Sequence, residues 1–73
     1  MYNHIKKGNL VRITGISYID FKKLPIYLVV DKKSENGFYC KCNFCLLNEK
    51  GHIIWFYADA NNPYKDIKLA IED

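Results

Sequence analysis

The sequence predicts a small all-β domain, and three observations support this fold class. Several short segments alternate apolar and polar residues, or are rich in β-branched residues, as strands are. Polar segments rich in Gly, Asn and Asp separate them, and these residues favour turns. No segment shows the 3.6-residue apolar period of an amphipathic helix. The chain has 73 residues, so we expect a single domain over residues 1–73.

The first half of the chain predicts two strands joined by a long connection. Residues 9–14 (NLVRIT) alternate apolar and polar side chains, which is typical of a half-buried strand. Residues 15–25 form a connection that is too long for a tight hairpin and that ends in a proline. Residues 26–31 (IYLVVD) are a nearly continuous apolar run, which favours a central strand. Residues 32–37 (KKSENG) then predict a polar turn.

The second half predicts three more strands. Residues 38–47 form one long strand, residues 48–51 (NEKG) a tight turn, and residues 52–58 (HIIWFYA) the returning strand. Residues 59–66 (DANNPYKD) are dense in turn formers and predict a short 3₁₀ segment. Residues 67–71 (IKLAI) place alternate apolar residues on one face, which indicates a fifth strand.

The tight turn also predicts the register of its hairpin. A type I turn with Gly51 in the left-handed region forms a G1 bulge and opposes Asn48 to His52. The even-numbered residues of the first strand then share one apolar face with the even-numbered residues of the second. This predicted core face comprises Phe38, Cys40, Cys42, Phe44 and Leu46 against Ile54, Phe56 and Ala58.

The three cysteines lie within six positions, which raises the question of a metal site. Cys40 and Cys42 fall on the predicted core face, where they act as small buried hydrophobes. Cys45 has the opposite parity and faces Trp55. Zinc needs four convergent ligands, and this parity opposes convergence unless a bulge intervenes. We therefore expect no metal and no cofactor; a zinc-stabilised domain is the alternative, with ligands Cys40, Cys42, Cys45 and either His52 or His4.

No pattern in the sequence predicts catalysis. A redox C-x-x-C pair works at the start of a helix, and no helix is predicted after Cys42 and Cys45. The sequence contains no nucleophile elbow, no phosphate-binding loop and no dinucleotide fingerprint. We expect a protein that is not an enzyme.

Charge is distributed unevenly along the chain, whose net charge is +3. Residues 1–41 hold eight Lys or Arg against three Asp or Glu. Such asymmetry occurs in nucleic-acid-binding proteins, although lysines also line solvated loops and the edges of sheets. Arg12 is the only arginine, and this disfavours sequence-specific DNA reading. The candidate nucleic-acid residues are Lys6, Lys7, Arg12, Lys22, Lys23, Lys32, Lys33 and Lys41.

The second face of the predicted hairpin is unusually apolar for a surface. Its odd-numbered positions include Leu47, Ile53, Trp55 and Tyr57. One interpretation is that the sheet curls and another segment, such as residues 15–21, covers this face. A second is a protein–protein interface, in which Trp and Tyr are frequent anchors. A third is an aromatic platform for single-stranded nucleic acid.

The order of the elements resembles that of the SH3-like small β-barrel over nearly the whole chain. The opening KKGNLVRI is similar to the x-x-G-x-x-V start of many such barrels, and with the closing NEKGHIIWFYA…IKLAI it resembles small SH3-like proteins of tailed bacteriophages. The resemblance implies a five-stranded barrel with a short 3₁₀ turn before the last strand. It implies a phage accessory or virion-associated protein, in the host cytoplasm or the virion. The chain lacks the ALYDY-like loop and paired Trp of peptide-binding SH3 domains, so recognition of proline-rich ligands is not implied.

Together these patterns predict a non-catalytic protein–protein interaction module whose partner is a phage structural protein or a host protein. A nucleic-acid-binding barrel that uses the lysine-rich half is the alternative, and a homo-oligomer is a further possibility. We expect neither a membrane segment nor a secretory signal peptide. The predicted contact residues are Trp55, Tyr57, Ile53 and Leu47, with Tyr18 and Phe21 at the rim.

Overall fold

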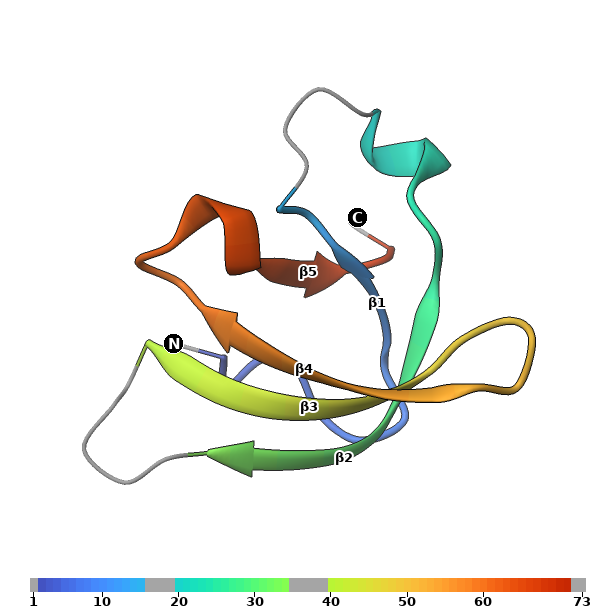
Figure 1. Cartoon of the computed structure of the whole chain (residues 1–73), viewed down its shortest axis with the longest axis horizontal. Helices are drawn as coiled ribbons and strands as arrows, with labels where there is room; N and C mark the ends of the chain where they lie inside the picture. The colour runs from blue at the N-terminus through green and yellow to red at the C-terminus, as the bar shows by residue number, and fades with distance from the viewer. Residues whose placement is uncertain (1, 16–19, 35–39, 72–73) are drawn as a thin grey trace.

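The computed structural model describes residues 2–15, 20–34 and 40–71, and the strands in these ranges form one five-stranded antiparallel sheet (Figure 1). The sheet order is β4-β3-β2-β1-β5. The predicted all-β class and the 3₁₀ turn before the last strand are confirmed. The elements are β1 (Leu10–Ile13), η1 (Phe21–Lys23), β2 (Tyr27–Ser34), β3 (Lys41–Leu47), β4 (Ile53–Asp59), η2 (Pro63–Lys65) and β5 (Ile67–Leu69).

Strand β2 bends the sheet and gives it two halves. Its pairing with β3 shifts between Val29 and Asp31, which leaves Val30 as an extra residue. Such a bulge bends and twists its strand. Figure 1 shows the result: β2 begins beside β1 and then turns to follow β3. The sheet nevertheless stays open, with β4 and β5 as its outer strands; the five predicted strands are confirmed, but they do not close into a barrel.

The hydrophobic core lies on the concave side of this bent sheet. Every described strand contributes to it, because the alternate residues of each strand point inward. The buried cluster contains Val11 of β1, Val29 of β2, Cys42, Phe44 and Leu46 of β3, Ala58 of β4 and Ile67 of β5. Partly buried residues, including Ile13, Tyr27, Phe56 and Leu69, pack against this cluster.

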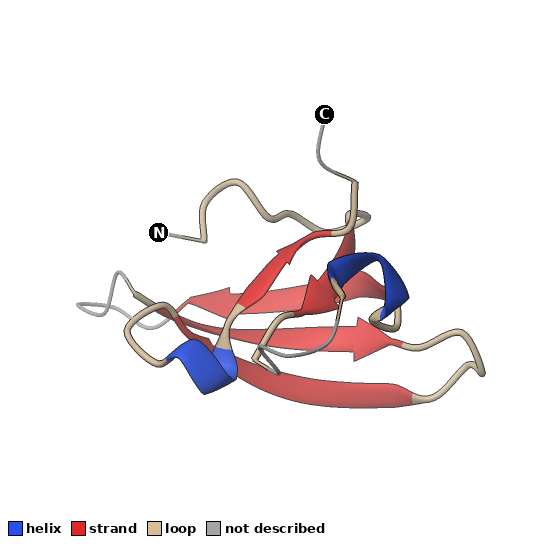
Figure 2. Ribbon diagram, turned by 90° about the horizontal axis from the view of Figure 1, so that it is seen from above, coloured by secondary structure: helices blue, strands red, loops and turns tan. Residues whose placement is uncertain are grey.

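The segment before β1 completes the core, which the sequence pattern does not reveal. Tyr2 and Ile5 are 5% and 0% exposed, and the Tyr2 ring meets the Phe44 ring edge-on with centroids 5.7 Å apart. The Lys32 ammonium donates hydrogen bonds to the carbonyls of Tyr2 (2.6 Å) and Ile5 (2.8 Å). These contacts hold the segment against the concave side, and Figure 2 shows it crossing above the long strands.

Several element bounds differ from the prediction by a few residues, and the largest differences have a local reason. Lys32–Ser34 belong to β2 rather than to a turn, because they pair with β3 as far as Cys42. The long connection contains the 3₁₀ turn η1, where the Asp20 side chain accepts a hydrogen bond from the Lys22 amide. Strand β5 ends at Leu69, and Ile71 is 70% exposed. The predicted strand residues 38 and 39 lie outside the described residues. No helix in the described ranges is long and apolar enough to cross a membrane.

Candidate protein interaction face

The turn between β3 and β4 sets which side chains point outward. Gly51 has φ 84°, the left-handed conformation that the predicted G1 bulge requires. The Asn48 amide donates to the His52 carbonyl at 2.9 Å, and the Asn48 side chain accepts from the amides of Lys50 and His52. The predicted register is confirmed along the whole hairpin, with Leu46 opposite Ile54, Phe44 opposite Phe56, Cys42 opposite Ala58 and Cys45 opposite Trp55.

The odd-numbered residues of β4 therefore point away from the core. Ile53 is 60% exposed and Trp55 is 51% exposed. Tyr57 and Leu47, on the same face, are half-buried. The interpretation that another segment covers this face is therefore wrong at Ile53 and Trp55.

The exposed face continues across the sheet as a row of aliphatic side chains. Leu10 pairs with Leu28, Leu28 with Leu47, and Leu47 with Ile53, so the four residues are successive cross-strand neighbours on β1, β2, β3 and β4. Directly opposed residues share one face of a sheet and lie close enough to touch. We call Leu10, Leu28, Leu47 and Ile53 the outer apolar row, and this row together with Trp55 the interaction face.

Sequence patterns could have shown Leu10 but not Leu28. Leu10 alternates with the core residue Val11, which indicates that Leu10 faces outward. Leu28 lies in a continuous apolar run, where alternation gives no signal for a face. Leu28 lies on the outer face because it pairs with Leu47, at a position in β2 that precedes the bulge at Val30.

Two charged residues, Lys33 and Asp31, lie on β2 on the same outer face as Trp55. The Lys33 ammonium lies over the Trp55 ring, 5.5 Å from its centroid, which is a cation–π geometry. Cys45 lies between Trp55 on β4 and Asp31 on β2 in the register and is 7% exposed. The interaction face is thus an apolar surface with a polar rim, as in protein interfaces.

Of the two residues predicted for the rim, the structure describes Phe21, which does not lie at Trp55. Phe21 instead packs against β1: the Arg12 guanidinium lies 5.1 Å from its ring centroid and donates to its carbonyl at 2.6 Å. Strands β2 and β3 separate β1 from β4 in the sheet. Tyr18 lies outside the described residues.

Three of the basic residues of the first half make contacts within the fold. Lys32 binds two backbone carbonyls, Arg12 stacks on Phe21, and Lys33 covers Trp55. Arg12 also carries a buried Nε for which the structure gives no partner within the described residues. The remaining candidates divide into Lys6, Lys7, Lys22 and Lys23, which are exposed, and Lys41, which is half-buried.

The cysteines lie as the register requires, with Cys40 and Cys42 on one face and Cys45 on the other. All three are free thiols. Cys42 is 1% exposed, and its thiol donates to the Lys33 carbonyl at 3.6 Å. Cys40 is half-buried and accepts a hydrogen bond from the Asn61 amide at 3.1 Å. His4 and His52 are exposed. Within the described part of the chain, no three potential metal ligands come together.

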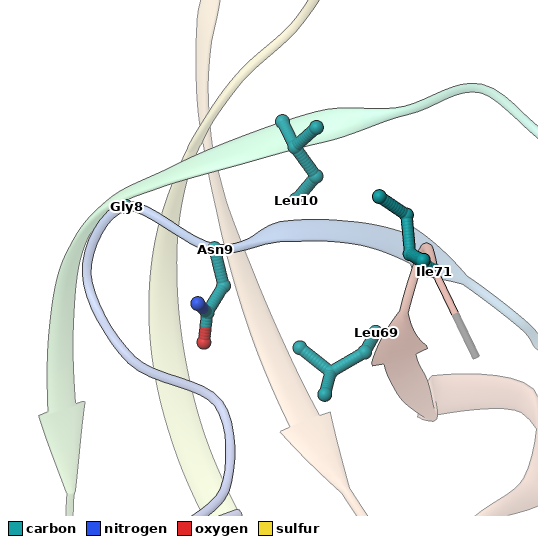
Figure 3. Close-up of a pocket in the computed structure, with 5 residues that line it drawn as sticks. All are labelled: Gly8, Asn9, Leu10, Leu69 and Ile71. Carbon is teal, nitrogen blue, oxygen red and sulfur yellow. The ribbon is translucent and has the colours of Figure 1, made fainter. Parts of the chain in front are cut away.

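A shallow groove of about 350 Å³ adjoins the outer apolar row at its β1 end (Figure 3). Leu10 lines both the groove and the row, so the apolar surface continues towards the end of β5. A second concavity of about 440 Å³ lies beside the β3–β4 turn and is lined by polar residues together with Pro25 and Tyr27. The groove residues are Gly8, Asn9, Leu10, Leu69 and Ile71.

No family model, curated protein or solved structure matches this chain.

Proposed function

We propose that this chain is a non-catalytic protein–protein interaction module that binds its partner through the interaction face. The observation that carries the proposal is the outer apolar row, which crosses four strands and ends beside a Trp55 side chain that is 51% exposed. Exposed apolar surface of this continuity is costly for a soluble protein and marks interaction sites. An exposed Trp next to aliphatic residues is also typical of the anchors that dominate binding energy.

The interaction face suits a protein partner better than a small ligand. It is a convex strip of side chains on a sheet that is held from behind by a buried core, so it can dock without rearranging. Leu28 and Leu47, at the middle of the row, are half-buried and would be fully covered by a partner, whereas Lys33 and Asp31 at its edge could remain hydrated. A dry apolar centre with a polar rim is the usual anatomy of protein interfaces.

The proposal includes an SH3-like scaffold and a role as a phage accessory or virion-associated protein. Three features support the scaffold: β5 lies beside β1, a 3₁₀ turn precedes β5, and β2 bends to serve both halves of the sheet. Gly8 of the KKGNLV start has φ 90°, and its amide donates to the Val29 carbonyl at 2.8 Å. A positive φ favours glycine, which explains why the KKGNLV start has a glycine at this position.

Affinity purification of the tagged chain from the cells that naturally produce it tests the proposal. We expect one protein to dominate the eluate and to resist high salt, because apolar contacts are weakly affected by screening. Nucleic acid that elutes instead, and that salt removes, would contradict the proposal and favour the nucleic-acid alternative.

A further inference from the structure

The two outer strands of the sheet differ in how they are protected from pairing. Strand β5 has three residues and carries an exposed Lys68 at its centre. Strand β4 has seven residues (IIWFYAD) with no Lys, Pro or Gly, and its pairing in the described sheet is with β3 alone. Short length and lysines blunt an edge, whereas a long apolar edge is a template for another strand. The β4 edge is therefore the less protected of the two and is suited to pairing with another strand.

The side of β4 that faces away from β3 presents the backbone of Ile53 and Trp55, which belong to the interaction face. At the two ends of the hairpin, the Asn48 amide bonds the His52 carbonyl and the Ala60 amide bonds the Cys40 carbonyl. Both bonds join even-numbered residues, and the register between them is continuous. In an antiparallel ladder the odd-numbered residues of β4 then direct their backbone N–H and C=O groups away from β3. Trp55, near the middle of β4, is one of them.

We propose that two copies of this chain pair antiparallel along β4, with Trp55 of one copy opposite Trp55 of the other. This register is symmetric about a two-fold axis, so each copy offers the surface that the other requires. It opposes Ile53 to Tyr57 on the outer face and Ile54 to Phe56 on the inner face. Each of these cross-strand pairs is apolar or aromatic, the kind that stabilises sheets.

Charge complementarity favours a second copy of this chain over a strand of another protein. The same register brings Asp59, the last residue of β4, to the start of β4 of the other copy, next to the β3–β4 turn that carries the exposed Lys50. One carboxylate and one ammonium therefore lie in the same region at each end of the paired strands. A register shifted by one pair, with Trp55 opposite Tyr57, would instead place the Asp59 carboxylate against the apolar Ile53 side chain.

The dimer is not part of the proposed function, but it enlarges the surface through which that function acts. Pairing along β4 leaves the outer faces of both sheets exposed on the same side of the joined sheet. The Ile53 and Trp55 side chains of the two copies then form one surface, about twice as large as the face of a single chain. This part of the inference rests on the proposed function, whereas the pairing itself does not.

Sedimentation equilibrium of the purified chain tests the pairing, with two substitutions at one position. Trp55→Pro removes the outward N–H without removing a bond to β3, and a proline on an edge strand is tolerated when its nitrogen faces outward. Trp55→Ala removes the same ring but keeps the N–H. The symmetric pair of residues 55 exchanges two backbone N–H···O bonds, and Trp55→Pro removes both, so we expect the dimer dissociation constant to be at least about ten-fold higher for Trp55→Pro than for Trp55→Ala. A wild-type chain that stays monomeric up to about 1 mM overturns the proposal.

Disulfide trapping tests the register, and it remains informative if Trp55→Pro does not fold. Directly opposed residues in a hydrogen-bonded pair have Cα atoms about 5.5 Å apart, within the range of a disulfide. Trp55→Cys should therefore link two copies through position 55 under mild oxidation, as located by peptide mass mapping. In this register two copies of position 53 lie roughly 13 Å apart, so Ile53→Cys is the matched control and should not link to itself. Equal linking of both variants, or linking of neither, contradicts the register.

Because these experiments use the purified chain alone, their outcome is independent of whether a heterologous partner exists. A monomeric chain that still captures a protein from cells would leave the proposed function intact and remove the dimer. A dimer that captures no other protein from cells would leave the pairing intact and contradict the proposed function.

Discussion

The hydroxyl of Tyr2 donates a hydrogen bond to the Asp66 carboxylate at 2.9 Å, across 64 positions of a 73-residue chain. Tyr2 is buried against Phe44, and Asp66 precedes β5. The Asp66 carbonyl also accepts from the Thr14 amide at 3.0 Å, just after β1. Asp66 therefore ties together the chain start, the end of β1 and the beginning of β5, and it helps to hold the open sheet in its bent form.

Tyr2→Phe should destabilise the fold while keeping the ring in the core. A hydrogen bond to a charged group contributes about 1.5–3 kcal/mol, so we expect a loss of that order in the free energy of unfolding. Urea denaturation measures it. His4→Ala, on an exposed residue of the same segment, is the control and should stay within about 0.5 kcal/mol of the wild type. Equal effects of the two substitutions would show that the bond contributes little.

The same contact predicts a loss of stability in alkali. Burial, and then the hydrogen bond to Asp66, raise the pKa of Tyr2 above its ordinary value of 10.0. The unfolded chain therefore loses the Tyr2 proton at a lower pH than the folded chain. The stabilisation is full below pH 10 and is lost as the pH rises above it. We expect the unfolding free energy of the wild type to fall more steeply above pH 10 than that of Tyr2→Phe; parallel curves for the two proteins would contradict this.

Lys32 should matter for stability rather than for binding nucleic acid. Its ammonium donates to two carbonyls of the N-terminal segment, so Lys32→Met leaves both acceptors without that donor. We expect a loss of about 1–3 kcal/mol and faster hydrogen exchange at the Ile5 amide, which bonds the Tyr2 carbonyl. Lys22→Met, at an exposed residue of η1, is the matched control for charge. If both substitutions leave exchange at Ile5 unchanged, Lys32 does not anchor the segment.

Gly15 should not tolerate a side chain. A Cβ at this position would collide with the backbone carbonyl of Tyr64 in η2, and the backbone cannot move aside as a flexible side chain would. We expect Gly15→Ala to cost about 2 kcal/mol or more, which thermal unfolding would measure. Lys65→Ala, on an exposed residue of the same turn, should have little effect. A stable Gly15→Ala protein would show that η2 can separate from the end of β1.

The β3–β4 hairpin shows which features of this fold can be predicted from sequence. Its register follows from local turn chemistry, because Gly51 and Asn48 fix how the two strands begin to pair. Side-chain parity then assigns Trp55 and Ile53 to the outer face without knowledge of the rest of the fold. For this reason the predicted contact residues on this hairpin fall on one face.

The features that escaped prediction depend on distant parts of the chain. Tyr2 and Ile5 belong to no periodic pattern, and they are core residues because of contacts with residues far along the sequence, such as Lys32 and Phe44. The bulge at Val30 lies within a uniform apolar run, so neither the bend nor the outward position of Leu28 has a local signal. Closure of the sheet is likewise a global property that strand count alone does not determine.

The account depends most on the claim that the interaction face is a docking surface and not part of the core. The most direct measurement is the amount of partner protein that Trp55→Ser retains in affinity purification, compared with wild type and with Tyr64→Ser. Tyr64 is 77% exposed and lies in η2, outside the interaction face and the adjoining groove, so it is a matched aromatic control. We predict that Trp55→Ser folds but loses the partner, while Tyr64→Ser keeps it. A Trp55→Ser protein that unfolds, or that folds and retains its partner in full, would contradict the account.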